Sequence, residues 1–248
     1  MTALLVDLGN SRWKIAHSLD ADIGRVVSGS YDAGTAFTAA INNCKIEFDR
    51  VLVASVISPE DAAMLVAMIE NSLRVPVRFI KATDRMPNVV SGYGKPEQLG
   101  VDRLLAMVAA RARTSQPLCV VDAGTATTID FVDQSGQHMG GFILPGLRLF
   151  RDCLLANTSI PRDSIVDELA MLGRDTPTAV ALGARYAVAG IVERFVSGSG
   201  SLFDGQQVQT FVGGGDAPRI LDLLPQPCTI LGDLVLRGLA VLAVHGDT

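Results

Sequence analysis

The chain has 248 residues, a net charge of −5 and 48% hydrophobic residues, enough to bury the core of one large domain or of two small lobes. Its apolar runs are broken by Gly, Asp or Arg before they reach about 20 residues, and its basic residues are scattered, so we expect no membrane span and no nucleic-acid surface. The N-terminus lacks the pattern of a signal peptide, which predicts a cytoplasmic protein. The four cysteines and three histidines lack metal-ligand spacing, so we expect no transition-metal site.

The first part of the chain predicts a β-hairpin followed by alternating helices and strands. Strands are expected at residues 4–7, 13–17, 51–56 and 75–80, and helices at residues 35–43, 58–73 and 102–113. Ser58, followed by Pro59 and two acidic residues, is typical of a helix N-terminus. A loop rich in Pro, Gly and polar residues is expected at residues 84–98. This alternation predicts a mixed sheet covered by helices.

The second part begins with a strand, a tight turn and a second strand at residues 118–131. A turn-rich strand at residues 140–146 leads into a helix at residues 147–156, and a long helix is expected at residues 178–196. Residues 197–205 are expected to form a surface loop. A strand at residues 208–212 ends in a glycine turn, and an apolar helix is predicted at residues 233–245.

The pattern Asp-x-Gly occurs twice, each time directly after an apolar strand. Placing Asp7 on Asp122 also aligns Gly9 with Gly124, which suggests two related halves. Such turns expose backbone N–H groups and nearby hydroxyls to an anion, although a single Asp-Gly turn is most often only a hairpin turn. Gly213–Gly215 adds a third glycine turn after a strand. Together the three turns indicate a site for phosphates and a nucleoside, and the absence of P-loop and Rossmann motifs argues against those two folds.

Short motifs spread over nearly the whole chain resemble those of one kinase family. They are the segments Asp7–Ser11, Tyr93–Pro96, Gly100–Arg103, Asp122–Ala126 and Gly140–Gly146, together with Thr176 seven positions before Gly183. With them the chain resembles the type III pantothenate kinases of the sugar kinase, heat-shock ATPase and actin superfamily. The resemblance implies an α/β fold of two related ribonuclease H-like lobes, residues 1–115 and 116–248, each a mixed sheet flanked by helices. It also implies an active site in the cleft between the lobes, and a homodimer.

The resemblance further implies ATP-dependent phosphorylation of pantothenate to 4'-phosphopantothenate, the first step of coenzyme A biosynthesis. The implied cofactors are ATP, Mg²⁺ and a monovalent cation, K⁺ or NH₄⁺. Asp102 is the expected general base, because a carboxylate at a helix start stays ionised and can accept the proton of an alcohol. Asp7 is expected near Mg²⁺, through water since that ion dehydrates reluctantly, and Asp122 is expected to bind the monovalent cation.

The other expected contacts fall into an ATP-binding and a substrate-binding group. The ATP-binding candidates are Asp7, Leu8, Gly9, Asn10, Ser11, Arg12, Trp13, Lys14 and Thr125. The substrate-binding candidates are Tyr93, Gly100, Val101, Asp102, Arg103 and Thr176. Arg103 is suited to a two-pronged hydrogen bond with the pantothenate carboxylate. Gly213–Gly215 is a candidate for the adenine side, and Ser11 keeps the hydroxyl of the Thr that many family members have at this position.

These residues also have ordinary structural interpretations. Lys14 fits a solvated lysine on a strand, Asp102 a helix-capping residue and Arg103 a surface ion pair. Asp122 and Thr125 fit a turn held by a side-chain hydrogen bond. Two alternative functions also stay open: another small-molecule alcohol kinase of the superfamily, and a nucleotide-binding regulator without catalysis, against which Asp102 and the two phosphate turns argue.

Overall fold

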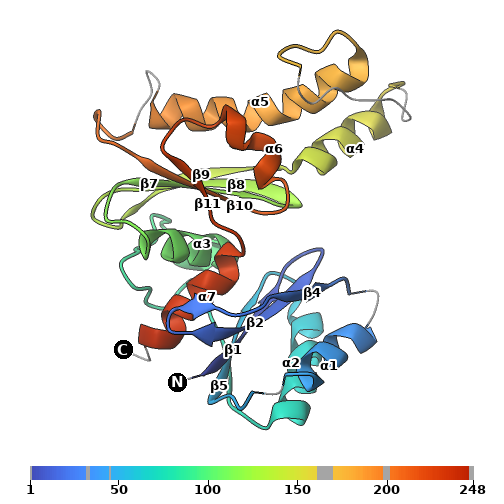
Figure 1. Ribbon diagram of the computed structural model, residues 1–248, viewed down its shortest axis with the longest axis vertical. Coiled ribbons are helices and arrows are strands. Elements are labelled where there is room, and N and C mark those ends of the chain that lie inside the picture. The colour runs from blue at the N-terminus through green and yellow to red at the C-terminus, as the bar shows by residue number, and fades with distance from the viewer. Residues whose placement is uncertain (1, 32–33, 45, 161–169, 198–201, 246–248) are drawn as a thin grey trace. The chain divides into compact units, whose positions relative to one another are not determined.

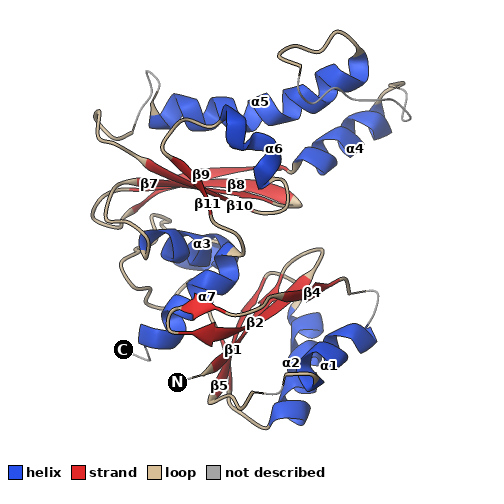
Figure 2. Cartoon of the chain, in the orientation of Figure 1, coloured by secondary structure: helices blue, strands red, loops and turns tan. Residues whose placement is uncertain are grey.

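The computed structural model describes residues 2–31, 34–44, 46–160, 170–197 and 202–245. Contacts divide the chain into two units: the first comprises Met1–Thr114, Gly136–His138 and Asp233–Thr248, and the second comprises Ser115–Ser135 and Met139–Gly232. Each unit contains one mixed sheet with helices packed against it (Figures 1 and 2). The predicted α/β fold of two mixed-sheet lobes is therefore confirmed.

The first sheet is built around the N-terminal strand. β1 (Ala3–Leu8) pairs antiparallel with β2 (Trp13–Leu19) and parallel with β5 (Arg50–Ser55), and β6 (Val77–Phe79) pairs parallel with β5. The short strands β3 (Asp22–Ile23) and β4 (Val27–Gly29) both pair with β2. The register places Asp7, near the end of β1, opposite Lys14 on one side and Ala54 on the other. The Asp7 turn therefore leaves the sheet at the carboxyl end of two parallel strands.

Helices cover both faces of the first sheet. α1 (Gly34–Asn42) and α2 (Pro59–Leu73) pack on the face that carries Leu4, Val6 and Leu8. α7 (Leu234–His245) contacts β1 and β2 from the other face (Figure 2) and packs against α3 (Val101–Arg111), which follows the short 3-10 helix η1 (Pro96–Gln98). A Cβ on Gly238 of α7 would lie 2.2 Å from the Leu105 carbonyl oxygen, so a glycine lets α7 and α3 approach closely.

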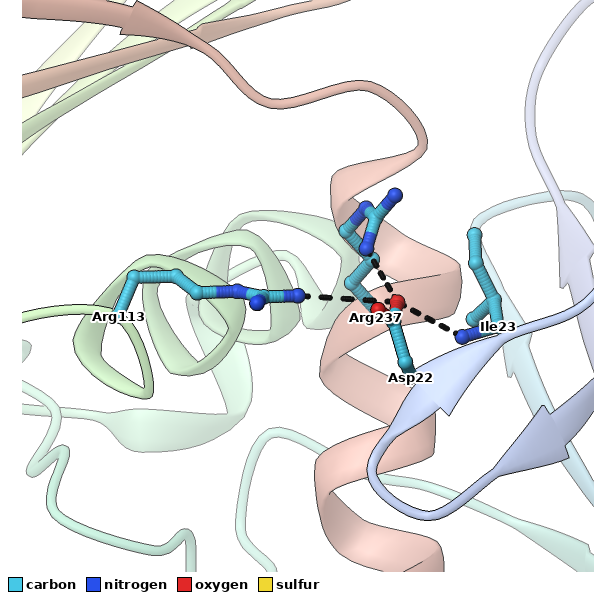
Figure 3. A network of polar contacts seen from close by, with 4 residues as sticks. All are labelled: Asp22, Ile23, Arg113 and Arg237. Atoms are coloured by element: carbon cyan, nitrogen blue, oxygen red, sulfur yellow. Dashed lines mark hydrogen bonds and ion pairs between the residues drawn. The ribbon is translucent and has the colours of Figure 1, made fainter.

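An ion-pair network fixes α7 to the first unit (Figure 3). Oδ1 of Asp22, on β3, accepts hydrogen bonds from Arg237 of α7 and, at 2.9 Å, from the Ile23 N–H, and it lies 3.6 Å from Nη2 of Arg113. The Ile23 N–H, followed by the two arginine charges, holds the pKa of Asp22 below its usual value, although partial burial acts in the opposite direction. α7 thus belongs to the first unit, whereas the sequence-based division at residues 115 and 116 assigns it to the second lobe.

The second sheet has β7 at its centre. β7 (Leu118–Ala123) pairs antiparallel with β8 (Ala126–Val132) and parallel with β10 (Gln209–Gly213), and β11 (Cys228–Ile230) and β9 (His138–Pro145) form the two edges. Helices α4 (Leu147–Asn157), α5 (Thr176–Val196) and α6 (Ala217–Ile220), with the short η2 (Leu221–Leu223), lie on one face (Figure 2). Val121, Phe131 and Val192 form part of the core beneath them.

Most predicted elements are present, and the shifted ends have local causes. α3 begins at Val101 and α5 at Thr176 because Gly100 and Asp175 occupy the N-cap positions. β6 begins at Val77 rather than at residue 75, where the next residue is a proline without an N–H group. The sequence does not predict β3, β4, β11 or α6, which are too short to show a hydrophobic period. Part of the loop predicted at residues 197–205 lies outside the described residues.

No helix in the described part of the chain combines the length and the apolar character that crossing a bilayer requires.

Candidate active site

The first Asp-x-Gly turn closes the hairpin of β1 and β2. Its Gly9 N–H donates to the Arg12 carbonyl oxygen at 3.1 Å, and the Leu8 carbonyl oxygen accepts from the Val56 N–H at 3.0 Å. The Tyr31 hydroxyl donates to the Gly9 carbonyl oxygen at 2.8 Å. These three hydrogen bonds fix the shape of the turn in which the predicted ATP-binding segment lies.

The side chains of this segment divide into a buried and an exposed group. The exposed side chains, at the tip of the turn, are Asn10, Ser11 and Arg12. Leu8 and Trp13 are buried in the core of the first unit, where the Trp13 ring lies edge-on to Phe37 with 5.3 Å between centroids. Any contact of Leu8 or Trp13 with a nucleotide would therefore be made by the backbone.

Tyr31 supports this turn, although the sequence analysis did not single it out. Burial raises the pKa of Tyr31 to about 12, and the negative charges of Asp7 and Asp61 add to the effect. The hydroxyl therefore stays protonated at neutral pH and acts as the donor to the Gly9 carbonyl oxygen. Tyr31 lies on the connection between β4 and α1, 22 positions from Gly9, so no local sequence pattern links it to the turn.

Lys14 pairs with an acidic residue from the other end of the chain. Its Nζ lies 2.9 Å from Oδ1 of Asp233, the residue directly before α7, and the two side chains are 32% and 31% exposed. The ion pair offsets the charge of the lysine and restricts its position. Lys14 is thus more restricted than a lysine that is merely solvated on a strand, which was the structural alternative for this residue. The pair has no signal in the sequence, since its members are 219 positions apart.

The second Asp-x-Gly turn is enclosed by two other glycine turns of the second unit. Within it, the Gly124 N–H donates to the Ala126 carbonyl oxygen at 3.1 Å. A Cβ on Gly146 would lie 2.1 Å from the Gly124 carbonyl oxygen, and a Cβ on Gly214 would lie 2.2 Å from the Ala123 carbonyl oxygen. Gly214 also has a φ of +85°, which L side chains rarely adopt. Only glycine therefore fits at residues 146 and 214.

This packing brings together residues that the sequence analysis identified separately. β10 pairs Gly213 with Asp122, so the glycine turn at residues 213–215 follows directly beside the Asp122 turn. The Gly146 N–H donates to the Thr125 carbonyl oxygen at 3.0 Å, and the Thr125 side chain is exposed. The cluster combines one carboxylate, one exposed hydroxyl side chain and three closely packed glycine turns. The glycine turns and the hydroxyl suit an anionic, phosphate-bearing ligand, and the carboxylate suits a cation bound beside it.

The predicted substrate residues form a cluster at the start of α3. Glycine at the N-cap position leaves room for a carboxylate, since a Cβ on Gly100 would lie 2.4 Å from Oδ1 of Asp102. That oxygen accepts a hydrogen bond from the Arg103 N–H at 2.8 Å, so Asp102 also acts as a helix-terminal acceptor. The Arg103 guanidinium donates to the Tyr93 hydroxyl at 2.9 Å, and its Cζ lies 5.7 Å from the centre of the Tyr93 ring. Tyr93 thereby orients Arg103.

A cavity of about 620 Å³ lies beside this cluster, within the first unit. Its walls come from the carboxyl ends of β5 and β6, the start of α2 and the start of α3, and include Ser55, Phe79 and Val101. Lys81 and Glu97 are the charged residues of the lining. The volume is in the range of small-molecule sites, which are mostly apolar with a few polar groups.

Thr176 is not gathered with the other predicted residues of its own unit. It is exposed at the first position of α5 and lines a cavity of about 550 Å³ together with Phe150 of α4 and Gly183 of α5. Neither Asp122 nor Thr125 belongs to the lining of that cavity.

The metal-binding potential of the chain rests on carboxylates at the glycine turns. Among the described residues, no three His, Cys, Asp or Glu side chains gather as in a preformed metal centre. Mg²⁺ usually binds proteins through one or two carboxylates and completes its shell with waters and substrate phosphates. Asp7 and Asp122, each partly buried at a glycine turn, fit this kind of binding.

Comparison with known proteins points to one family. The family model described as type III pantothenate kinase matches residues 3–198. A type III pantothenate kinase from Nitrosococcus oceani is 36% identical over 253 residues, which cover 97% of this chain and 93% of the relative. The similarity thus extends over nearly the full length of both proteins.

Solved structures share the fold at lower identity. A Campylobacter jejuni protein described as a Baf family transcriptional activator has a TM-score of 0.59 and 22% identity, with 95% of this chain and 94% of that chain covered. A ROK family glucokinase from Streptomyces griseus, in complex with glucose and AMPPNP, has a TM-score of 0.53 and 12% identity, with 99% and 100% covered. At these identities the likeness concerns the fold alone.

Proposed function

Because the chain belongs to the type III pantothenate kinase family, and is therefore a pantothenate kinase that uses ATP, we propose that Asp102 is its general base. The carboxylate accepts the proton of the primary alcohol of pantothenate while the alcohol oxygen attacks the terminal phosphate of ATP. ADP leaves, and 4'-phosphopantothenate is formed. The observation that carries this proposal is the position of Asp102 in the first turn of α3, where the Arg103 N–H binds one of its oxygens and the helix dipole favours the ionised form.

For the nucleotide, we propose that the turn after β1 binds phosphates through its backbone and through Asn10, Ser11 and Arg12. Their exposure at the tip of a fixed turn supports this assignment. Lys14 adds a positive charge whose position is restricted by Asp233. Thr125 is proposed as a further ATP contact, and Gly213–Gly215 as the adenine side.

For the metal ions, we propose that Asp7 holds Mg²⁺ through water and that Asp122 binds K⁺ or NH₄⁺. These cations would offset the negative charge of the phosphates during transfer. The carboxylates of Asp7 and Asp122 are positioned by glycine turns, which permit close approach of a ligand to the backbone.

For pantothenate, we propose that Arg103 binds the substrate carboxylate by two parallel hydrogen bonds. The hydrogen bond from Arg103 to Tyr93 supports this role, because it fixes the guanidinium plane. Gly100 and Val101, which line the cavity beside Asp102, are proposed to contact the rest of the substrate. Thr176 is also proposed to contact the substrate, because the resemblance to the family implies this role.

Replacement of Asp102 by Asn tests the proposed base. Asn keeps the shape but cannot take a proton, so kcat is expected to fall by about 10²- to 10⁴-fold while ATP affinity stays within about twofold. A coupled assay of ADP release and equilibrium nucleotide binding measure the two quantities. Asp152→Asn, an exposed carboxylate of α4, is the control and keeps full activity. An unchanged kcat in Asp102→Asn removes Asp102 from the mechanism.

Replacement of potassium by sodium tests the monovalent cation. Wild-type turnover is expected to be higher in K⁺ than in Na⁺, and Asp122→Ala is expected to lose most of this preference. Both are measured as ADP release at matched ionic strength. A wild type that is indifferent to the exchange of the two ions contradicts the role of Asp122.

We also propose a homodimer in the cytoplasm. Exposed apolar side chains on the second unit support an interface, among them Met171 and Leu172, which are 79% and 76% exposed. Leu172→Asp is expected to convert the dimer into a monomer in light scattering. Met64→Asp, on α2 of the first unit and 55% exposed, is the control and leaves the dimer intact. A wild-type monomer at working concentration contradicts this proposal.

A further inference from the structure

Two side chains, Tyr93 and His138, form a row with Arg103 within the first unit. The Tyr93 ring stacks on the His138 ring, with 5.8 Å between centroids and 15° between planes. The Arg103 guanidinium lies over the same Tyr93 ring and donates to its hydroxyl at 2.9 Å. His138 is buried. Arg103, the neighbour of Asp102, is buried as well, so both ends of the row lie inside the first unit.

The backbone around His138 holds the loop that carries Tyr93. The Val90 N–H donates to the Gly136 carbonyl oxygen, and the His138 N–H donates to the Val90 carbonyl oxygen, each at 2.9 Å. A Cβ on Gly92 would lie 1.9 Å from the His138 carbonyl oxygen, so only a glycine allows this close approach. The segment at residues 136–138 thus supports Tyr93 through both its backbone and the His138 ring.

We infer that His138 is a positioning residue for the pantothenate carboxylate, acting through Tyr93 on the guanidinium of Arg103. This inference rests on the proposed function, which assigns Arg103 to that carboxylate. A two-pronged bond between a guanidinium and a carboxylate requires a defined orientation of the guanidinium plane. A group that is oriented before binding loses less conformational freedom when the substrate arrives, which strengthens binding.

The same geometry predicts which kinetic constant depends on His138. The ring of His138 stacks on Tyr93, which bonds to Arg103, whereas the proposed base is the Asp102 carboxylate in the first turn of α3. Loss of the His138 ring is therefore expected to weaken pantothenate binding and to leave the chemical step and the ATP site unchanged. A histidine that only fills space in the core would instead affect stability, with no selective effect on pantothenate.

Ring removal and ring replacement at residue 138 test the inference in the full-length chain. His138→Leu is expected to raise KM for pantothenate about threefold to tenfold, with kcat and KM for ATP within about twofold of wild type. His138→Phe restores a flat ring and is expected to bring KM for pantothenate back to within about twofold. If His138→Leu does not fold, His138→Gln, which is polar and has no ring, carries the same expectation. His17→Leu, on β2, is the matched control and leaves all three constants unchanged.

The outcomes separate this inference from the proposed function. A wild type without pantothenate-dependent ADP release, or an Arg103→Ala variant with unchanged KM for pantothenate, overturns the proposed function. An active wild type with a sensitive Arg103→Ala variant, but with an unchanged KM in the ringless His138 variant, overturns only the inference. The inference is also overturned when kcat and both KM values of the ringless variant change together. It is likewise overturned when His138→Phe does not restore the KM for pantothenate.

Discussion

The two Asp-x-Gly turns share a sequence pattern, yet different groups hold them in place. In the first unit, side chains distant in sequence support the turn: the Tyr31 hydroxyl binds its glycine carbonyl oxygen, and Asp233 pairs with Lys14 on the adjoining strand. In the second unit the backbone does so, because a Cβ on Gly146 or Gly214 would collide with carbonyl oxygens of the turn. The same short motif is therefore sensitive to different substitutions in the two halves of the chain.

The difference sets the size of the expected effects. A turn enclosed by backbone has no space for one additional carbon atom, and forcing a side chain into it displaces main-chain groups. A turn held by side chains loses one hydrogen bond at a time, at about 1 kcal/mol each. Single substitutions around the Asp122 turn should thus be more destabilising than those around the Asp7 turn.

Gly214→Ala should have the largest effect on stability. The new Cβ would lie 2.2 Å from the Ala123 carbonyl oxygen, and the residue would need to keep a φ of +85°. We expect the free energy of unfolding to fall by about 3 kcal/mol or more, measured by urea denaturation. Gly146→Ala, with an added Cβ at 2.1 Å from the Gly124 carbonyl oxygen, should behave in the same way.

The adjacent glycine provides the control for this substitution. A Cβ on Gly215 meets no atom within 4 Å, so Gly215→Ala should change stability by no more than about 0.5 kcal/mol. Equal effects at residues 214 and 215 would show that backbone enclosure does not distinguish the second turn.

The sequence predicts these turns well because their signal is local. An apolar strand followed by Asp-x-Gly is visible in a few consecutive residues, and most strands and helices are likewise predicted from their hydrophobic period. The pairing of Gly213 with Asp122 cannot be read from any local pattern, since β10 joins β7 across a long connection. The packing of α7 on the first sheet is equally non-local, so the sequence-based division places this helix in the other lobe.

Tyr31→Phe should have a smaller effect, in the turn that side chains support. It removes the donor to the Gly9 carbonyl oxygen, and we expect a loss of about 1 kcal/mol in urea denaturation at pH 7. Because burial raises the pKa of Tyr31 to about 12 from the usual 10, its contribution is complete below pH 10 and is lost as the pH rises toward 12. The difference between wild type and Tyr31→Phe should therefore shrink over this interval.

The control for Tyr31 is a tyrosine outside the turn. Tyr186 is 43% exposed on α5, so Tyr186→Phe should leave stability nearly unchanged at pH 7 and between pH 10 and pH 12. If the two tyrosine variants are equally stable at neutral pH, the hydrogen bond to Gly9 does not support the first turn.

The candidate site shows the same limit of sequence reasoning as the fold. Tyr93 and Arg103 belong to recognisable motifs, and the structure joins them by a hydrogen bond. Tyr31, Asp233 and His138 belong to no motif, because each contributes a single side chain from a distant segment. Motifs thus identify the residues proposed to contact ligands, whereas the residues that orient them become visible only in three dimensions.

Asp22→Asn should have the smallest effect, and it tests the side-chain support that holds α7 in the first unit (Figure 3). Because Asp22 is about half exposed, loss of its pairs with Arg237 and Arg113 should cost less than about 1 kcal/mol at pH 7. The pKa of Asp22 is lowered in the folded chain, so its contribution is present above pH 4 and is lost as the pH falls below that value. Urea denaturation at pH 7 and pH 3 should show a difference between wild type and variant that is smaller at pH 3. Asp20→Asn, in the turn before β3, is the control, and a gap between Asp22→Asn and wild type that does not shrink at pH 3 would mean that packing, rather than charge, fixes α7.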